Sequence, residues 1–184
     1  MLIRFAVSNF LSFDGQQELS LEAGKARKYS DRLYVKRKLK LVKCEALFGC
    51  NASGKSNLVE ALQFVQDTVE DGFPRGFSNN YYRLKEENKL KPSNFEIEFI
   101  CQDKRFCFGF SAILNSGNII KEWLYEITPS GIKKDLYFRN VEQESFIVGS
   151  YFKKKAAITK LINYGEDSSG CLLYTSPSPR DSWA

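Results

Sequence analysis

The sequence contains no histidine in its 184 residues. This absence excludes a Ser-His-Asp triad, a papain-like Cys-His pair and an HExxH zinc site built from this chain alone. Long apolar runs are missing too, since no run approaches the roughly 20 residues that a membrane span needs. The first residues alternate in polarity and do not form the apolar core of a signal peptide. We therefore expect a cytoplasmic protein without a membrane partner.

The sequence also lacks any CxxC pair, although it has five cysteines. An odd number without such pairs argues against both a zinc ribbon and a secreted disulfide framework. We expect reduced thiols that pack as small hydrophobic side chains. The five are Cys44, Cys50, Cys101, Cys107 and Cys171.

Positive charge is concentrated in one segment. The chain as a whole has a net charge of +5, with 43% apolar and 14% aromatic residues, which indicates a folded globular protein. Residues 25–43 carry nine basic side chains against Asp31 alone, a local charge of +8 that leaves −3 for the remainder. Such a segment favours a polyanionic neighbour, either nucleotide phosphate or nucleic acid. A solvated lysine-rich loop is the alternative interpretation.

The first half of the chain predicts a hairpin, a buried strand and a helix. Residues 2–10 alternate as a strand, and the turn signal Asp14-Gly15 leads to a second alternating segment over 18–22. After a loop across the basic segment, the apolar run over 39–48 has the profile of a strand buried on both faces. Apolar residues then recur at helical spacing over about 55–70, before Gly72 and Pro74.

The second half predicts an antiparallel β-meander of about four strands over residues 94–150. Polarity alternates with a period of two, and polar turn residues separate the segments. One face is aromatic, with Phe106, Phe108 and Phe110 in register, and we interpret it as core and not as a surface for stacking bases. Because the sequence predicts both strands and a helix, we expect an α/β protein.

One motif carries chemistry. Residues 49–56 read GCNASGKS and fit the phosphate-binding pattern GxxxxGK[ST] at every fixed position, between the expected strand and helix. Gly49 and Gly54 permit positive φ and a close approach of the backbone to a ligand. The loop N–H groups and the helix N-terminus form an anion site, Lys55 suits the β- and γ-phosphates, and the hydroxyl of Ser56 suits Mg²⁺. The sequence therefore predicts ATP and Mg²⁺ as ligands. The predicted contact residues are Gly49, Cys50, Asn51, Ala52, Ser53, Gly54, Lys55, Ser56 and Asn57.

The loop and its surroundings resemble a known family. The string from Asn51 to Asn57 resembles the GxNxSGKSN phosphate loop of ATP-binding-cassette-like ATPases of the structural-maintenance-of-chromosomes, RecF and OLD kind. The segment FAVSNFLSF over 5–13 is similar to the opening strand of the same group. Segments 18–25, 95–99 and 122–125 look like the branch of AAA-family ATP-binding proteins from bacterial abortive-infection and phage-defence loci. The resemblance covers roughly residues 1–140.

The resemblance implies an ATPase head in which an antiparallel β-lobe packs on a RecA-like core. Two heads of a homodimer would sandwich ATP, each completing the other's site, and their ATP-driven association would control an effector protein or a transaction on DNA. In this family Asn51 helps to position the γ-phosphate side of the loop. Ala52 stands where glycine is frequent, a change that the loop tolerates if φ stays negative there.

Family motifs that normally lie in the second half of a head do not occur in the sequence. These are an LSGGE-like signature, an apolar run followed by Asp-Glu, and a switch histidine. We therefore expect residues 1–170 to be the N-terminal part of a longer ATPase. This part alone should bind nucleotide weakly at most and should not hydrolyse it appreciably. Lys55 is then the sole candidate for a catalytic role in this chain.

The last residues, 171–184, do not continue the pattern. The string CLLYTSPSPRD over 171–181 resembles a one-frame translation of a widely used transposase sequencing adapter. We interpret this tail as non-native and exclude it from the fold. A natural disordered Ser/Pro tail is the alternative.

Two other functions stay open at this point. In the first, the chain is a nucleic-acid-binding module in which the basic segment contacts phosphates and nucleotide is a structural ligand. In the second, it is a P-loop kinase or GTPase, which the β-meander after the first helix disfavours because those folds alternate strand and helix.

Overall fold

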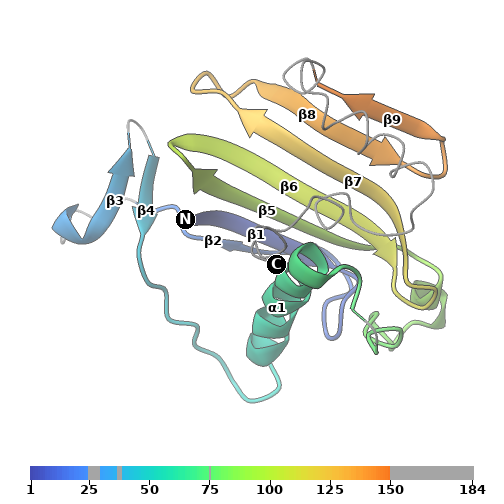
Figure 1. Ribbon diagram of the computed structural model, residues 1–184. Helices are drawn as coiled ribbons and strands as arrows, with labels where there is room; N and C mark the ends of the chain where they lie inside the picture. Colours follow the sequence, from blue (N-terminus) through green and yellow to red (C-terminus); the bar gives the residue numbers. More distant parts are fainter. Residues whose placement is uncertain (25–29, 37–38, 75, 150–184) are drawn as a thin grey trace, which may run out of the picture.

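The computed structural model describes residues 1–24, 30–36, 39–74 and 76–149. Seven strands form one antiparallel sheet in the order β2-β1-β5-β6-β7-β8-β9 (Figure 1). The predicted opening hairpin is confirmed, since β1 pairs antiparallel with β2. The bounds are β1 Leu2–Ser8, β2 Gln17–Ser20, β5 Ser93–Cys101, β6 Lys104–Ile113, β7 Asn118–Ile127, β8 Lys133–Asn140 and β9 Ser145–Val148.

The predicted meander is confirmed, with five strands where about four were expected. Each pair from β5 to β9 is antiparallel and joined by a short turn. Gln102 and Asp103, the two residues between β5 and β6, both have positive φ (44° and 68°), which matches the right-handed twist of the strands they join. The meander does not stand alone, because β5 also pairs with β1 from the start of the chain.

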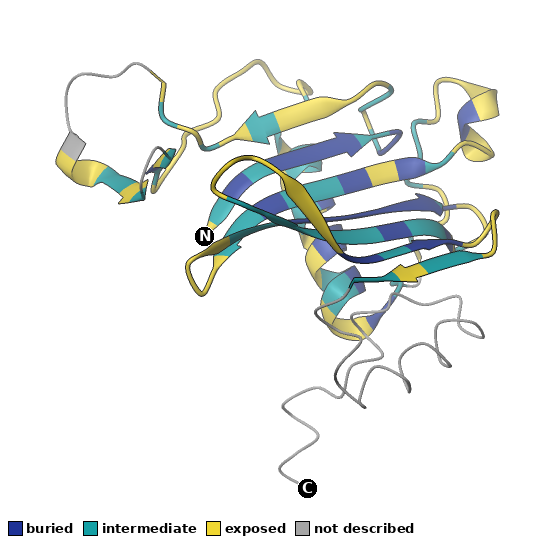
Figure 2. Cartoon of the chain, turned by 90° about the horizontal axis from the view of Figure 1, so that it is seen from above, coloured by how far each residue is buried: buried dark blue, intermediate teal, exposed yellow. Residues whose placement is uncertain are grey.

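One helix, α1 (Lys55–Asp71), covers one face of this sheet (Figure 1). The predicted helix is confirmed, and Gly72 with φ 82° follows its last residue. Its buried face carries Phe64, whose ring lies 5.0 Å from Phe95 on β5 and 6.2 Å from Phe110 on β6. These aromatic rings form the centre of the core. Figure 2 shows the buried residues along the central strands and the exposed ones at the turns.

A two-stranded hairpin, β3 (Leu33–Lys36) and β4 (Leu39–Val42), extends from the edge of the sheet near β2. Backbone hydrogen bonds from Val42 N to Leu21 O (2.9 Å) and from Ala23 N to Lys40 O (2.7 Å) attach it. The prediction of a loop across the basic segment is therefore wrong for residues 33–36 and 39–42. Two 3₁₀ turns complete the described elements, Ser30–Arg32 before β3 and Glu86–Lys89 before β5.

The prediction of a strand buried on both faces over residues 39–48 is wrong. β4 ends at Val42, and every residue from Lys43 to Cys50 is exposed; Phe48 is 91% exposed. Residues 39–42 do form a strand, β4, and it pairs along its length with β3. Among the described residues, β4 pairs with no parallel strand and residues 43–48 belong to no strand.

Candidate functional site: the phosphate-binding loop

The loop predicted to bind phosphate leads directly into α1. Gly54 is the N-cap with φ 91° and ψ 4°, a left-handed conformation that favours glycine, as predicted. The helix has no side-chain cap and no acidic residue in its first turn. Its first N–H groups and the positive end of its dipole are therefore not neutralised by a carboxylate, which is the electrostatic condition for binding an anion.

Lys55 lies folded over the loop. Its ammonium donates hydrogen bonds to the carbonyl oxygens of Gly49 (2.8 Å) and Cys50 (2.7 Å), and to the hydroxyl of Ser53 (3.3 Å). Ser53 N also donates to Cys50 O at 3.3 Å, which closes a turn inside the loop. The cation thus lies within the ring of loop residues, where the phosphates of a ligand would meet it.

Gly49 and Gly54 meet different structural requirements. Gly49 does not have positive φ, contrary to the prediction; instead, a Cβ there would lie 2.9 Å from Ser53 Oγ and 3.9 Å from Lys55 Nζ. Position 49 is therefore glycine because the loop closes tightly on itself. The crowding comes from the side chains of Ser53 and Lys55, which lie over the backbone of residue 49.

Ala52 is the strained residue of the loop. Its φ is 63°, so the condition under which alanine was expected to replace glycine without cost, a negative φ, is not met. A left-handed conformation costs an L-residue about 1–2 kcal/mol relative to a right-handed one. Strain of this size is typical of functional loops whose shape the surroundings impose.

The other predicted contact residues differ in their exposure and hydrogen bonding. Asn51 and Ser56 are exposed, so the side-chain oxygens of both are open to solvent and to a ligand. The amide of Asn57 is engaged differently, because its Nδ2 donates to the hydroxyl of Ser12 at 2.8 Å. Ser12 and the neighbouring Phe13 touch the loop from outside the motif. Both residues belong to the segment 5–13 that resembles the opening strand of the family, but only the fold shows that they reach Gly54.

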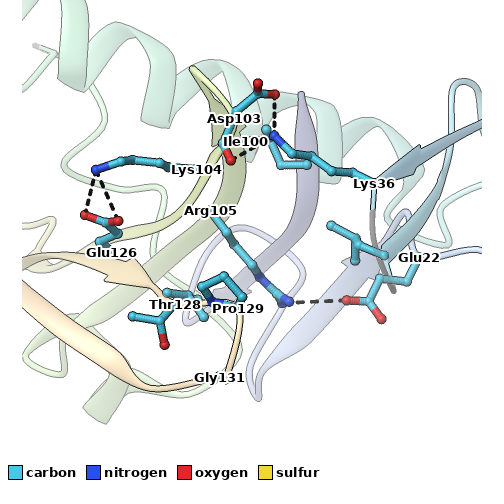
Figure 3. Close-up of a pocket in the computed structure, with 12 residues that line it drawn as sticks. Glu22, Lys36, Ile100, Asp103, Lys104, Arg105, Glu126, Thr128, Pro129 and Gly131 are labelled. Carbon is cyan, nitrogen blue, oxygen red and sulfur yellow. Dashed lines mark hydrogen bonds and ion pairs between the residues drawn. The ribbon is translucent and has the colours of Figure 1, made fainter.

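A pocket of about 720 Å³ is lined by residues outside the phosphate loop. Figure 3 shows this pocket and its lining side chains, which include residues of the β3–β4 hairpin and of the β5–β6 and β7–β8 turns. Its cations are paired with carboxylates: Lys36 with Asp103, Lys104 with Glu126, and Arg105 with both Glu22 and Glu98. A pocket whose charges already neutralise one another offers no excess charge to a phosphate.

One group of potential metal ligands occurs among the described residues, formed by Glu96, Glu98 and Cys107. Arginine side chains already occupy this cluster. Arg4 contacts both carboxylates, and Arg105 Nε donates to Glu98 Oε2 at 2.9 Å. Burial, reinforced by the two carboxylates, raises the pKa of the Cys107 thiol to about 12. The two guanidinium groups would repel a cation, so we assign the cluster to ion pairing across the outer face of the sheet.

Other predictions have mixed outcomes. The four described cysteines are free, but three of them (Cys44, Cys50 and Cys101) are exposed, so packing as small hydrophobic side chains holds for Cys107 alone. Of the nine basic residues in segment 25–43, five lie outside the described residues, as do Cys171 and the predicted tail 171–184. Nucleic-acid binding by this segment stays a prediction.

A glycine-rich loop that closes around a lysine and opens an uncapped helix is typical of the P-loop nucleotide-binding proteins. The profile of the family described as "AAA domain, putative AbiEii toxin, Type IV TA system" matches residues 46–151. The chain belongs to this family, and membership implies an ATP-binding, ATPase-type function in a toxin–antitoxin or abortive-infection context. No curated protein matches the sequence significantly. In the described part of the chain, no helix combines the length and hydropathy of a membrane span.

Proposed function

We propose that the chain binds ATP through residues 49–57. The observation that carries this proposal is the uncapped start of α1, which has no acidic residue in its first turn and has Lys55 held over the loop. Backbone N–H groups of the loop and of the first helical turn bind the phosphate oxygens. The Lys55 ammonium exchanges its carbonyl acceptors, Gly49 O and Cys50 O, for phosphate oxygens, which carry more negative charge.

Mg²⁺ fits the same site. The exposed hydroxyl of Ser56 is a hard oxygen ligand at the first helical turn, one residue after Lys55. The ion would neutralise charge on the β- and γ-phosphate oxygens. The chain's own contribution is to orient the phosphates with backbone N–H groups and to place the lysine cation beside them.

We also propose that in the full-length protein the loop belongs to an ATP-binding-cassette-like head with a RecA-like core. The exposed segment 43–48 supports this, because its apolar residues Leu47 and Phe48 are 42% and 91% exposed immediately before the phosphate loop. A strand of a parallel core sheet would bury them. ATP-driven association of two such heads, coupled to an effector or a DNA transaction, is the activity we assign to the full-length protein.

The first experiment measures ATP binding by this chain with and without Mg²⁺, by titration calorimetry into the millimolar range. Lys55→Ala should raise the Kd at least tenfold, because the loss of a charged hydrogen bond costs about 1.5–3 kcal/mol. Lys91→Ala is the matched control, since Lys91 is an exposed lysine that pairs with Glu87 and lies outside the loop. Equal affinity of the Lys55 variant and the unmodified chain would refute the proposal. In the full-length protein, Lys55→Ala should abolish ATP turnover.

A further inference from the structure

A tight turn over residues 9–13 connects β1 to the segment before β2 and lies beside the phosphate loop. Two backbone hydrogen bonds close it, Phe10 N to Phe13 O (3.0 Å) and Phe13 N to Phe10 O (2.8 Å). Asn9 and Leu11 both have left-handed backbones, with φ 50° and 49°. For leucine this conformation is unfavourable by about 1–2 kcal/mol, so the surroundings must hold the turn in place.

A buried amide, that of Asn9, fixes the start of the turn. Asn9, which is 5% exposed, donates from Nδ2 to Asn88 O (2.9 Å) and Lys91 O (3.0 Å) and accepts from Tyr82 N (3.1 Å) at Oδ1. Leu11 N donates to Asn80 O at 2.6 Å. The four backbone groups that Asn9 and Leu11 bind all belong to the segment between α1 and β5. The turn is therefore tied to the chain that leaves the helix.

The turn is also fixed in the core. The ring of Phe10 is fully buried, with its centroid 5.4 Å from Phe64 of α1 and 5.3 Å from Phe95 of β5. Phe64 lies more than two turns into the helix whose first residue is Lys55. The same five-residue turn thus contacts the middle of α1 and, through its last two residues, the start of α1.

The last two residues of the turn contact the point where the loop becomes the helix. A Cβ at Gly54 would lie 3.0 Å from both Phe13 Cε1 and Ser12 Oγ, so both side chains contact the loop backbone there. Ser12 Oγ also accepts the hydrogen bond from Asn57 Nδ2 at 2.8 Å. Gly54 and Asn57 flank Lys55 and Ser56, the residues that we assign to phosphate and Mg²⁺.

We propose that the 9–13 turn holds the phosphate loop in its nucleotide-binding geometry, with Ser12 and Phe13 as positioning residues. This inference rests on the proposed ATP binding and adds to it two residues outside the matched range 46–151. Ser12 fixes the first helical turn through Asn57, and Phe13 supports the left-handed Gly54. Because phosphate binding needs several N–H groups aligned at once, small displacements of this junction reduce affinity steeply.

The test compares ATP affinity with thermal stability in variants of the chain. Ser12→Ala should raise the Kd about three- to tenfold, the effect of one lost hydrogen bond, and Phe13→Ala about tenfold or more. Ser12→Thr, which keeps the hydroxyl, should restore most of the affinity. Asn57→Ala should add little to Ser12→Ala, because the two residues act through one bond. Phe106→Ala is the matched control, since Phe106 is a partly buried phenylalanine that stacks on Phe99 at 5.7 Å and lies outside the turn.

Hydrogen exchange without nucleotide provides a second readout. Phe13→Ala should accelerate exchange of the amides from Ala52 to Leu58, whereas Phe106→Ala should not. If Lys55→Ala abolishes binding but Ser12→Ala and Phe13→Ala bind as the unmodified chain does, the positioning role is refuted and ATP binding stands. If the Phe13 and Phe106 variants lose melting temperature and affinity in the same proportion, the role is merely structural and the proposal fails. Absence of ATP binding by the unmodified chain would refute both proposals.

Discussion

The antiparallel sheet and the phosphate-loop segment of this chain differ in how far their side chains are buried. Phe64, between α1 and the sheet, is fully buried, whereas Phe48, one residue before the loop, is 91% exposed. The sheet supplies its own core, because β5 to β8 and α1 bury one another's aromatic side chains. The segment from Lys43 to Ser53 is exposed throughout, and it is anchored by the elements at its two ends, β4 and α1. Stability therefore resides in the sheet, and the nucleotide site that we propose lies in a loop that contributes little to that stability.

Cysteine reactivity should show the largest difference between the two regions. The nucleophile in alkylation is the thiolate, and a free cysteine has a pKa of about 8.5. Burial raises the pKa of Cys107 on β6 to about 12, whereas Cys50 in the loop is exposed. At pH 8 we expect Cys107 to be alkylated more than a hundredfold more slowly than Cys50, as measured by mass spectrometry of the labelled peptides.

Cys44 and Cys101 are exposed and serve as internal references. In guanidinium all four rates should converge, and a native Cys107 that reacts as fast as Cys101 would contradict the comparison. The sign of the pH effect follows from the same pKa. The folded chain keeps the Cys107 proton after the unfolded chain has lost it, so this thiol lowers the free energy of unfolding as the pH rises above about 8.5.

The same substitution in the two regions should give very different losses of stability. Phe64→Ala removes a ring that contacts five other aromatic rings and should lower the free energy of unfolding by about 3–5 kcal/mol. Phe48→Ala should change it by less than about 0.5 kcal/mol. Chemical denaturation monitored by circular dichroism measures both. A loss above 1 kcal/mol for Phe48→Ala would show that the loop segment packs in solution.

Glycine positions provide a smaller contrast of the same kind. A Cβ at Gly109 on β6 would lie 2.4 Å from Trp123 Cζ2 and 2.8 Å from Phe95 O, whereas a Cβ at Gly15 meets nothing within 4 Å. Gly109→Ala should lower the free energy of unfolding by about 1–3 kcal/mol through overpacking. Gly15→Ala should have an effect near zero. If the two variants melt alike, Trp123 does not pack against Gly109 as described.

The parts of the fold that the sequence predicts are those with a local signal. The hairpin turn at Gln102-Asp103, the helix before Gly72 and the alternation of Phe106, Phe108 and Phe110 all depend on neighbours in the chain. The run 39–48 shows where this logic fails. Apolar composition reports that a segment can form a buried strand, but the burial itself depends on partner strands, which no local pattern specifies.

The site divides in the same way. The GxxxxGKS pattern identifies the loop because its chemistry is encoded by contiguous residues. The backbone of Ala52 was not predictable, since a left-handed alanine contradicts the local preference of that residue and arises from closure of the loop. The contacts of Ser12 with Asn57, 45 residues apart, arise only when β1 and α1 pack on the same sheet.

The sheet order also has a kinetic consequence. β1 and β5 are neighbours, yet Ser8 and Asn94, which hydrogen-bond across them, are 86 residues apart, and the phosphate loop and α1 lie within this interval. Closing a chain loop becomes costlier by about 0.6 kcal/mol for each doubling of its length, so the hairpins of the meander should form before β1 docks. The phosphate loop would then acquire its final shape last, when β1 delivers the 9–13 turn to the start of the helix. A newly made chain would thus complete its core, with Phe5, Val7 and Phe10, in the same step that prepares the loop to hold a nucleotide.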